Sequence, residues 1–187
     1  MLFEASSSCT DTESVIRERF DAFMLSRGYR ADGTAMVRGS RLGTFTSLNP
    51  RKWAVRVTLE PRAPKRHFLR FDVNTSGHMT ITPSERGFWE RELEATVNVL
   101  DGKSAGDLVA AEAAATSSGK SILVHMFGFL AVFAAVELVG AFIGLRLPPG
   151  FSAIGAGIGF AVGYHRSNAA AKNAASNPPG GGAPSRR

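Results

Sequence analysis

The chain has 187 residues, of which 44% are hydrophobic, and a formal net charge of +6. This length allows one or two domains. Its single cysteine, Cys9, excludes an intrachain disulfide and fits a reducing compartment. The first residues lack a basic start followed by an apolar run, so no signal peptide is expected there.

The first helix is predicted over residues 11–27. Thr10 and Glu13 match a capping box, in which side chains and backbone satisfy each other's free donors. Gly28 is a suitable end for the helix, and the nine residues before Thr10 are expected to be frayed. The apolar residues that share one helical face are Val15, Ile16, Phe20, Phe23 and Met24.

Residues 34–82 change to a period of two. Val55, Val57 and Leu59 alternate with polar or small residues, and Leu69, Phe71 and Val73 do the same. Alternation of this kind is typical of strands with one buried face and one wet face. Segments 35–39, 43–48 and 78–82 are weaker strand candidates, so we expect an antiparallel meander of four or five strands.

A second capping box, Thr82 with Glu85, and Pro83 at the first helical position predict the start of a second helix. Its apolar stripe runs to Leu100, and Gly102 follows. Residues 1–102 are therefore predicted to form a two-layer α+β domain of helix, antiparallel β-meander and helix, with both helices on one face of the sheet.

The remaining chain is predicted to form a helical connector, a membrane hairpin and a tail. Residues 103–120 are Ala-rich and helix-prone. Residues 121–165 hold two apolar stretches separated by a break around Pro148, and predict a two-helix transmembrane hairpin. Residues 166–187 are rich in Ala, Asn, Pro and Gly and predict a disordered C-terminal tail.

The charges that flank the hairpin predict its orientation. Lys120 lies at one end, with Arg166 and Lys172 at the other, and only Arg146 lies in the turn. Because Lys and Arg are retained on the cytoplasmic side, both termini are expected to be cytoplasmic. The Arg-, Ala- and Gly-rich composition suggests a bacterial protein, and hence the inner (cytoplasmic) membrane.

Glycines recur every four residues in both halves of the hairpin. Small residues at this spacing allow membrane helices to approach closely. The pattern resembles the glycine zipper of membrane proteins that oligomerise or form channels, and the resemblance implies a homo-oligomer. The alternative is that the glycines only pack the two helices of one hairpin together. The candidate helix-packing residues are Gly140, Gly144, Gly155, Gly159 and Gly163.

Glu137 is the candidate polar residue within the membrane. Its spacing to Gly140 and Gly144 places it on the same helical face. A carboxylate near the bilayer centre costs about 2.5–3.5 kcal/mol on insertion scales, so it is a functional candidate by default. It is either part of a polar path, a residue that hydrogen-bonds across helices, or a single tolerated acid.

The basic charge is concentrated between Gly33 and Phe71, a stretch that contains nine Lys or Arg residues and one acidic residue. Such a patch attracts phosphates. We expect the outward basic residues of the strands to bind anionic lipid, or else to form an ordinary solvated face. Nucleic-acid binding is disfavoured, since Trp53 and Phe71 share the buried parity and mainly Phe68 is left outward to stack on bases. The candidate basic surface consists of Lys52, Arg56, Arg66 and Arg70.

No residue pattern indicates an enzyme, a metal or a cofactor. The histidines have no ligand spacing among themselves or with Cys9. Residues 114–121 match a loose phosphate-loop pattern, but a helix precedes it where a strand is needed. We therefore expect no catalytic residue, no metal and no cofactor.

Two functions remain open. The first is a non-enzymatic membrane-anchored protein, whose cytosolic domain binds a protein partner or the anionic membrane surface and whose Gly-rich hairpin anchors and oligomerises. The second is a small oligomeric pore or membrane-perturbing effector, with Glu137 and the glycine faces in its pathway.

Overall fold

The computed structural model describes residues 1–63, 65–78, 80–145, 147–148 and 150–176. The chain divides into two compact units, which are described separately. The N-terminal unit comprises Met1–Ile81 and Glu85–Thr116, and the C-terminal unit comprises Thr82–Ser84 and the chain from Ser117 onward.

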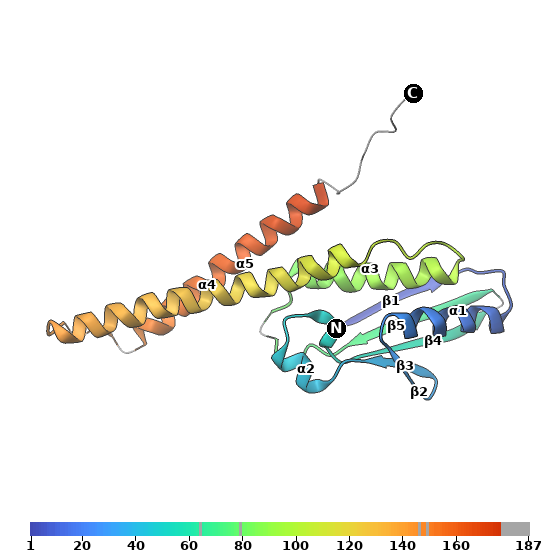
Figure 1. Ribbon diagram of the computed structural model, residues 1–187, viewed down its shortest axis with the longest axis horizontal. Coiled ribbons are helices and arrows are strands. Elements are labelled where there is room, and N and C mark those ends of the chain that lie inside the picture. Colours follow the sequence, from blue (N-terminus) through green and yellow to red (C-terminus); the bar gives the residue numbers. More distant parts are fainter. Residues whose placement is uncertain (64, 79, 146, 149, 177–187) are drawn as a thin grey trace, which may run out of the picture. The chain divides into compact units, whose positions relative to one another are not determined.

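A five-stranded antiparallel sheet forms the N-terminal unit, in the order β1-β5-β4-β3-β2 (Figure 1). Strands β3, β4 and β5 are consecutive antiparallel neighbours, as the predicted meander requires, whereas β2 lies before its predicted start at residue 34 and was not predicted. Strand β1 adds to it beside β5, so the first residues are ordered in the sheet and the prediction of a frayed terminus is wrong. The strands are β1 (Leu2–Ser7), β2 (Arg30–Asp32), β3 (Ala35–Arg38), β4 (Val55–Ala63) and β5 (Arg66–Val73).

Strand β1 was missed because a single large buried side chain marks it. Phe3 lies opposite Phe71 in the register. Polar contacts hold the rest of the strand: the Met1 ammonium donates to the Val73 carbonyl oxygen at 2.7 Å, and Ser7 Oγ donates to Asp101 Oδ1 at 2.6 Å. A strand held in this way has little hydrophobic periodicity to detect.

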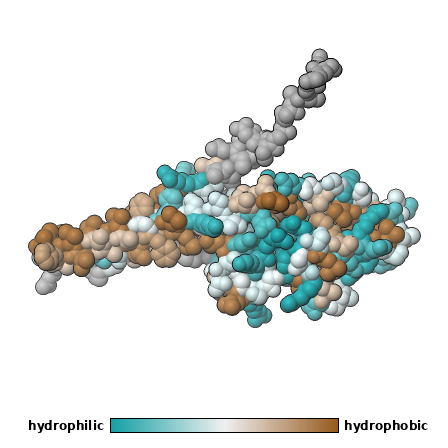
Figure 2. Space-filling view, viewed as in Figure 1, coloured by the Kyte–Doolittle hydropathy of each residue, from teal (hydrophilic) through white to brown (hydrophobic). Residues whose placement is uncertain are grey.

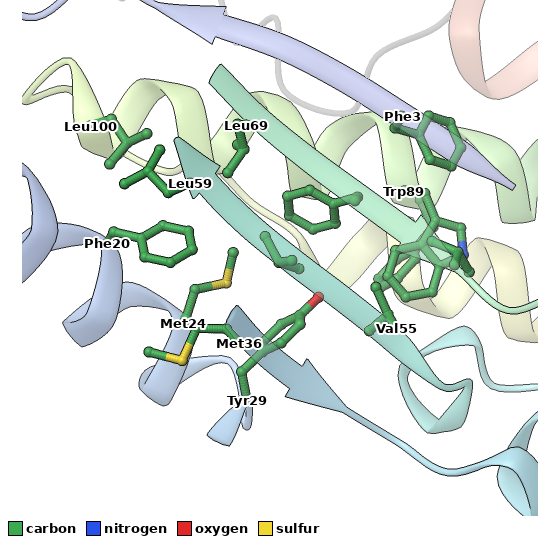
Figure 3. Packing of buried hydrophobic residues seen from close by; sticks show 14 of the residues in the cluster. Phe3, Phe20, Met24, Tyr29, Met36, Val55, Leu59, Leu69, Trp89 and Leu100 are labelled. Carbon is green, nitrogen blue, oxygen red and sulfur yellow. The ribbon is translucent and has the colours of Figure 1, made fainter. Parts of the chain in front are cut away.

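One face of the sheet carries the core, and helices α1 (Glu13–Ser26) and α3 (Pro83–Leu100) both contribute to it. In Figure 3, Phe20 and Met24 from α1 and Trp89 and Leu100 from α3 lie against strand residues such as Leu69. The prediction that both helices cover one face is therefore confirmed. The fully buried strand residues of this core are Val57, Leu69, Phe71 and Val73.

The helix ends differ in part from the predicted caps. Thr10 and Glu13 form no capping box, because α1 begins after Thr12, whose side chain makes no cap hydrogen bond. Helix α3 begins at Pro83 as predicted. Gly102 follows that helix at φ +75°, a conformation that favours glycine.

Two weaker strand candidates are wrong. Residues 43–48 fall instead on the short helix α2 (Arg41–Thr46), which is followed by the 3₁₀ helix η1 (Pro50–Lys52). The reason is local: Ser40 Oγ accepts a hydrogen bond from the Gly43 amide at 2.9 Å and starts a helix there. Residues 78 and 80–82 form no strand, and Met79 lies outside the described residues.

The N-terminal unit extends beyond the predicted boundary at 102. Helix α4 (Val109–Phe142) is continuous, and its first two turns belong to this unit. Ala111 and Ala115 lie in the core, and Glu112 Oε2 pairs with Arg51 Nη1 at 3.3 Å. Sequence periodicity missed this attachment because alanine is too small to mark a buried stripe.

Helix α5 (Phe151–Ser176) continues past the predicted start of the tail at 166. Half of residues 167–176 are alanine, and the others are Ser, Asn and Lys. Alanine has the highest helix propensity of any residue. The prediction of a disordered tail over this stretch is therefore wrong. Residues 177–187, which complete that prediction, lie outside the described residues.

Candidate functional site

The most apolar helix is the first candidate for function. Within the part of the chain that the structure describes, α4 is the one helix long and apolar enough to cross a membrane, and only 6% of its most apolar stretch is buried. Figure 2 shows this stretch as a continuous hydrophobic surface. Monomeric soluble proteins rarely expose an apolar surface of this extent. Its exposed large side chains include Val124, Phe127, Val132, Leu138, Val139 and Phe142.

The second predicted span, residues 147–164, falls mainly on α5, which is rich in Ala and Gly. Among the described residues, α5 is not long and apolar enough to count as a candidate membrane span, whereas α4 is. Of the two predicted spans, only the first is therefore supported by length and composition.

Helices α4 and α5 pack against each other through the glycines of α5. A Cβ atom on Gly159 would stand 2.3 Å from the His125 carbonyl oxygen, and one on Gly163 would stand 2.7 Å from Ile122 Cα. On Gly155 it would meet the Phe133 ring at 2.4 Å. At Gly159 and Gly163 the backbone of α4 leaves no room for a side chain, and at Gly155 the Phe133 side chain fills the space. The structure thus brings all three together on one helix–helix contact inside a single chain.

The glycines predicted on the first helix do not share this contact. Gly144 lies beyond the end of α4 at φ +80°, with open space around it. A Cβ on Gly140 would meet Leu147 Cδ1 at 3.4 Å, an ordinary contact distance with the turn. The four-residue spacing of Gly140 and Gly144 predicted that both lie on one helical face, but α4 ends at Phe142, before Gly144.

Glu137 binds the start of α5. Its Oε1 accepts a hydrogen bond from the Ser152 amide at 3.1 Å, and Ser152 is the second residue of that helix. The first amides of a helix have no partner within it, and the helix dipole favours a negative charge there. The structure thus gives Glu137 a partner within the chain, where the sequence showed no basic residue at its depth.

Small polar side chains join the two helices at the other end of their contact. Ser118 Oγ and Ser167 Oγ are hydrogen-bonded and buried. His125 Nδ1 donates to the Ser121 carbonyl oxygen at 2.7 Å, which leaves Nε2 to accept from Arg166 Nη1 at 3.3 Å. Sequence reasoning missed this group, although polar residues flanking an apolar helix are a usual sign of such contacts.

The predicted basic surface is dispersed in the structure. Arg56 forms an ion pair with Asp32 at 2.7 Å and lies opposite Asp72 in the register. Arg70 lies across from Glu4. Glu4 and Asp32 come from strands before the basic stretch of sequence, and Asp72 follows that stretch directly on β5, so the outward sheet face carries both signs of charge. Of the other two residues, Arg66 begins β5 and Lys52 lies on η1, outside the strands.

A buried charge cluster lies in the core of the N-terminal unit. Glu92 is fully buried and accepts two parallel hydrogen bonds from Arg38, at 2.7 and 2.8 Å. The Arg27 Nε atom lies 3.6 Å from the same carboxylate. The Arg38 guanidinium also lies 4.3 Å from the centre of the Tyr29 ring. No sequence pattern pairs Arg38 with Glu92, because 54 positions separate them.

Burial, and after it the nearby Glu92 carboxylate, raises the pKa of Tyr29 well above its usual value of 10.0. Burial by itself would lower the pKa of Arg38, but Tyr29 and Glu92 outweigh it and raise that pKa. The Tyr29 hydroxyl has no hydrogen-bond partner among the described residues. The cluster therefore keeps Arg38 charged and Tyr29 neutral near neutral pH.

Tyr29→Phe should leave the stability unchanged near neutral pH and improve it in alkali. The folded pKa of Tyr29 exceeds the unfolded one, so the stability it supports is complete below about pH 10 and is lost as the pH rises through the folded value. Urea unfolding near neutral pH and in alkali, followed by the fluorescence of the two tryptophans, would measure the free energy of unfolding of both proteins. Equal alkaline losses in the variant and the wild type would contradict it.

A shallow cleft of about 460 Å³ lies beside the β4–β5 turn and the start of α1. It is lined by charges of both signs, so charge alone selects neither an anion nor a cation. Cys9, predicted to be frayed, is buried and lies 3.4 Å from Asp11 Oδ2. Among the described residues, no group of three His, Cys, Asp or Glu side chains could hold a metal ion. The charged lining consists of Asp11, Glu13, Arg62 and Lys65, and His67 lies beside them.

In comparisons with known proteins, no family model, no curated protein and no solved structure matches this chain.

Proposed function

We propose that this chain is a non-enzymatic membrane-anchored protein, in which α4 and α5 insert as a hairpin and carry the α+β domain at the cytoplasmic surface of a bacterial inner membrane. The observation that supports it best is the almost fully exposed apolar surface of α4. Residues 117–142 rise about 39 Å at about 1.5 Å per residue. That exceeds the hydrocarbon thickness of about 30 Å.

The inner side of the hairpin supports insertion as a pair of helices. Glu137 and Ser152 lie on the contact between α4 and α5, as do Ser118 and Ser167. Polar groups buried between helices avoid the cost of facing lipid. The basic residues Lys120, Arg166 and Lys172 flank the open end, which fits cytoplasmic termini.

The glycine contact bears on self-association. Helix α4 of the same chain covers the surface of α5 at Gly155, Gly159 and Gly163. In this proposal they close the hairpin, so a homo-oligomer would need a different face. The predicted homo-oligomer stays a prediction, as does a protein partner for the α+β domain.

Insertion is tested by extraction of bacterial membranes with alkaline carbonate, which removes peripheral proteins. Wild type should stay in the pellet. Val132→Asp combined with Val136→Asp places two carboxylates on exposed positions of α4, each costing about 2.5–3.5 kcal/mol in lipid, and should abolish stable insertion. Leu25→Asp, at an exposed leucine of α1, is the matched control and should behave as wild type. Release of wild type by carbonate would contradict the anchor.

The pore alternative predicts that wild type depolarises the bacterial membrane and that Glu137→Ala and Gly159→Leu do not. We expect no depolarisation by any of the three, because Glu137 is engaged by the amide of Ser152 rather than left free in a pathway. A potential-sensitive dye, read after induction at matched protein levels, measures this. Depolarisation by wild type that both variants lose would overturn the anchor in favour of the pore.

A further inference from the structure

Helix α2 exposes two large apolar side chains one turn apart. Leu42 is 72% exposed and Phe45 is 61% exposed. A single exposed leucine is common on protein surfaces. Here the two share one face of a six-residue helix, so they form a small apolar tip on the N-terminal unit.

The segment around this tip is firmly built. Thr44 is buried, and its Oγ1 donates to the Ser40 carbonyl oxygen at 3.1 Å and accepts from the Ala54 amide at 2.9 Å. His78 Nε2 lies 2.7 Å from the Thr44 carbonyl oxygen, and its ring lies 4.0 Å from that of Trp53. The tip is therefore presented by an ordered scaffold.

Close backbone packing holds α2 in this position. A Cβ on Gly43 would stand 2.3 Å from the Lys52 carbonyl oxygen, so only glycine allows α2 to approach η1. A Cβ on Gly77 would stand 2.0 Å from the Phe45 ring, which rests against that glycine. The support lies beneath Phe45 and leaves most of its surface open.

The charges around the tip are of one sign. Arg41 and Lys52 are exposed, and residues 39–54 contain no acid. Residues 74–78, next to Phe45, contain none either. Glu112 pairs with Arg51 at 3.3 Å, and Arg51 therefore neutralises that carboxylate. This surface differs from the outward sheet face, where acids accompany Arg56 and Arg70.

We propose that α2 docks the domain onto an anionic lipid bilayer, with Leu42 and Phe45 entering the headgroup boundary and Arg41 and Lys52 binding lipid phosphates. Apolar side chains flanked by basic ones are the pattern that binds such surfaces. The inference rests on the proposed anchor, because tethering through α4 gives α2 a high effective concentration at the membrane. An interface this small suffices only under those conditions.

Its size and charge favour lipid over a protein partner. A stable protein interface buries roughly 800 Å² on each partner, whereas two side chains on one helical turn offer far less. A bilayer needs no matching shape and supplies the negative charge that Arg41 and Lys52 require.

The test uses the full chain with Cys9→Ala, reconstituted into vesicles. A fluorescent label at Thr46→Cys reports contact with brominated acyl chains, which quench it. A label at Glu60→Cys on the outward sheet face is the control site. We expect several-fold stronger quenching at position 46 than at 60 in phosphatidylcholine vesicles containing phosphatidylglycerol, and a clear decrease in phosphatidylcholine alone.

Leu42→Ser with Phe45→Ser should reduce quenching at position 46 to the level of the control site. Arg41→Gln with Lys52→Gln should remove the dependence on phosphatidylglycerol. Leu25→Ser, at another exposed leucine, and Arg62→Gln with Lys65→Gln, which remove the same charge elsewhere, are the matched controls and should change neither. Carbonate extraction of the same vesicles reports hairpin insertion separately, so failure of the anchor and failure of α2 docking are distinguishable.

Two outcomes would overturn the proposal. Strong quenching at position 60 with little at 46 would assign docking to the sheet face. No quenching at 46 in carbonate-resistant protein, with cross-linking from position 45 to one defined protein in cells, would assign the tip to a protein partner.

Discussion

Glu92→Ala is expected to destabilise the α+β domain by about 3–5 kcal/mol, the usual cost of removing one partner of a buried ion pair. The fully buried carboxylate accepts two hydrogen bonds from Arg38. Its loss leaves the Arg38 charge in the core, with Arg27 beside it and without the carboxylate that Arg38 binds through two hydrogen bonds. Most domains have only about 5–15 kcal/mol of stability, so the effect is large.

The measurement is urea unfolding of the full chain in detergent, followed by tryptophan fluorescence. Both tryptophans, Trp53 and Trp89, lie in the core of the domain, so the signal reports that unit alone. Glu90→Ala is the matched control on the same helix, since Glu90 makes an exposed pair with Arg86 and should cost about 0.3–0.5 kcal/mol.

A double variant separates the pair from its charges. Arg38→Met with Glu92→Leu removes both charges and fills a similar volume, and it should recover much of the loss seen in Glu92→Ala. If Glu92→Ala costs no more than Glu90→Ala, the carboxylate and Arg38 are not a buried pair in solution.

Sequence periodicity predicted the elements that bury a broad apolar stripe. Helices α1 and α3 and strands β4 and β5 were placed within a few residues, because large side chains repeat in them with the period of the element. Elements held by polar or small residues were missed or misassigned. Strand β1 depends on backbone pairing and Ser7, α2 on Ser40 and Thr44, and the start of α4 on two alanines.

The candidate site was predictable only in part for the same reason. Glycine spacing drew attention to positions of α5 at which an added Cβ would meet α4, because small residues allow helices to approach closely. Their spacing does not reveal which helix they pack against, because that depends on the tertiary structure. The signs of neighbouring charges depend likewise on strand order: Arg56 appeared to belong to a basic face, yet the sheet places Asp32 and Asp72 beside it.

The hairpin contact and the anchor are connected through Glu137. A carboxylate in an apolar helix is costly when it faces lipid. Its hydrogen bond to Ser152 exists only while α5 lies along α4, so in the proposed anchor a closed hairpin lowers the cost of inserting this polar side chain. The close approach at Gly159 and Gly163 therefore has a second consequence: it holds α5 along α4, and so keeps Glu137 beside the Ser152 amide.

Gly159→Leu is therefore expected to separate α5 from α4. The first atom of the new side chain would stand 2.3 Å from the His125 carbonyl oxygen and 2.8 Å from Met126 Cα. Both are backbone atoms of α4, which cannot move aside without the helices parting. Gly157→Leu is the matched control on the same helix, because a Cβ there meets no atom within 4 Å.

A disulfide between the two helices reads out the contact. Ser118 and Ser167 touch through their hydroxyls, so cysteines at both positions lie within reach of a bond. In a Cys9→Ala background, oxidised membranes should give a high yield of the intrachain disulfide. Gly157→Leu should preserve that yield and Gly159→Leu should lower it several-fold.

If Gly159→Leu instead keeps the intrachain disulfide but removes a cross-linked dimer, the glycine face serves assembly between chains, as the glycine-zipper resemblance implies. Within one chain the same substitution should also loosen the bond between Glu137 and Ser152, so both losses are expected together.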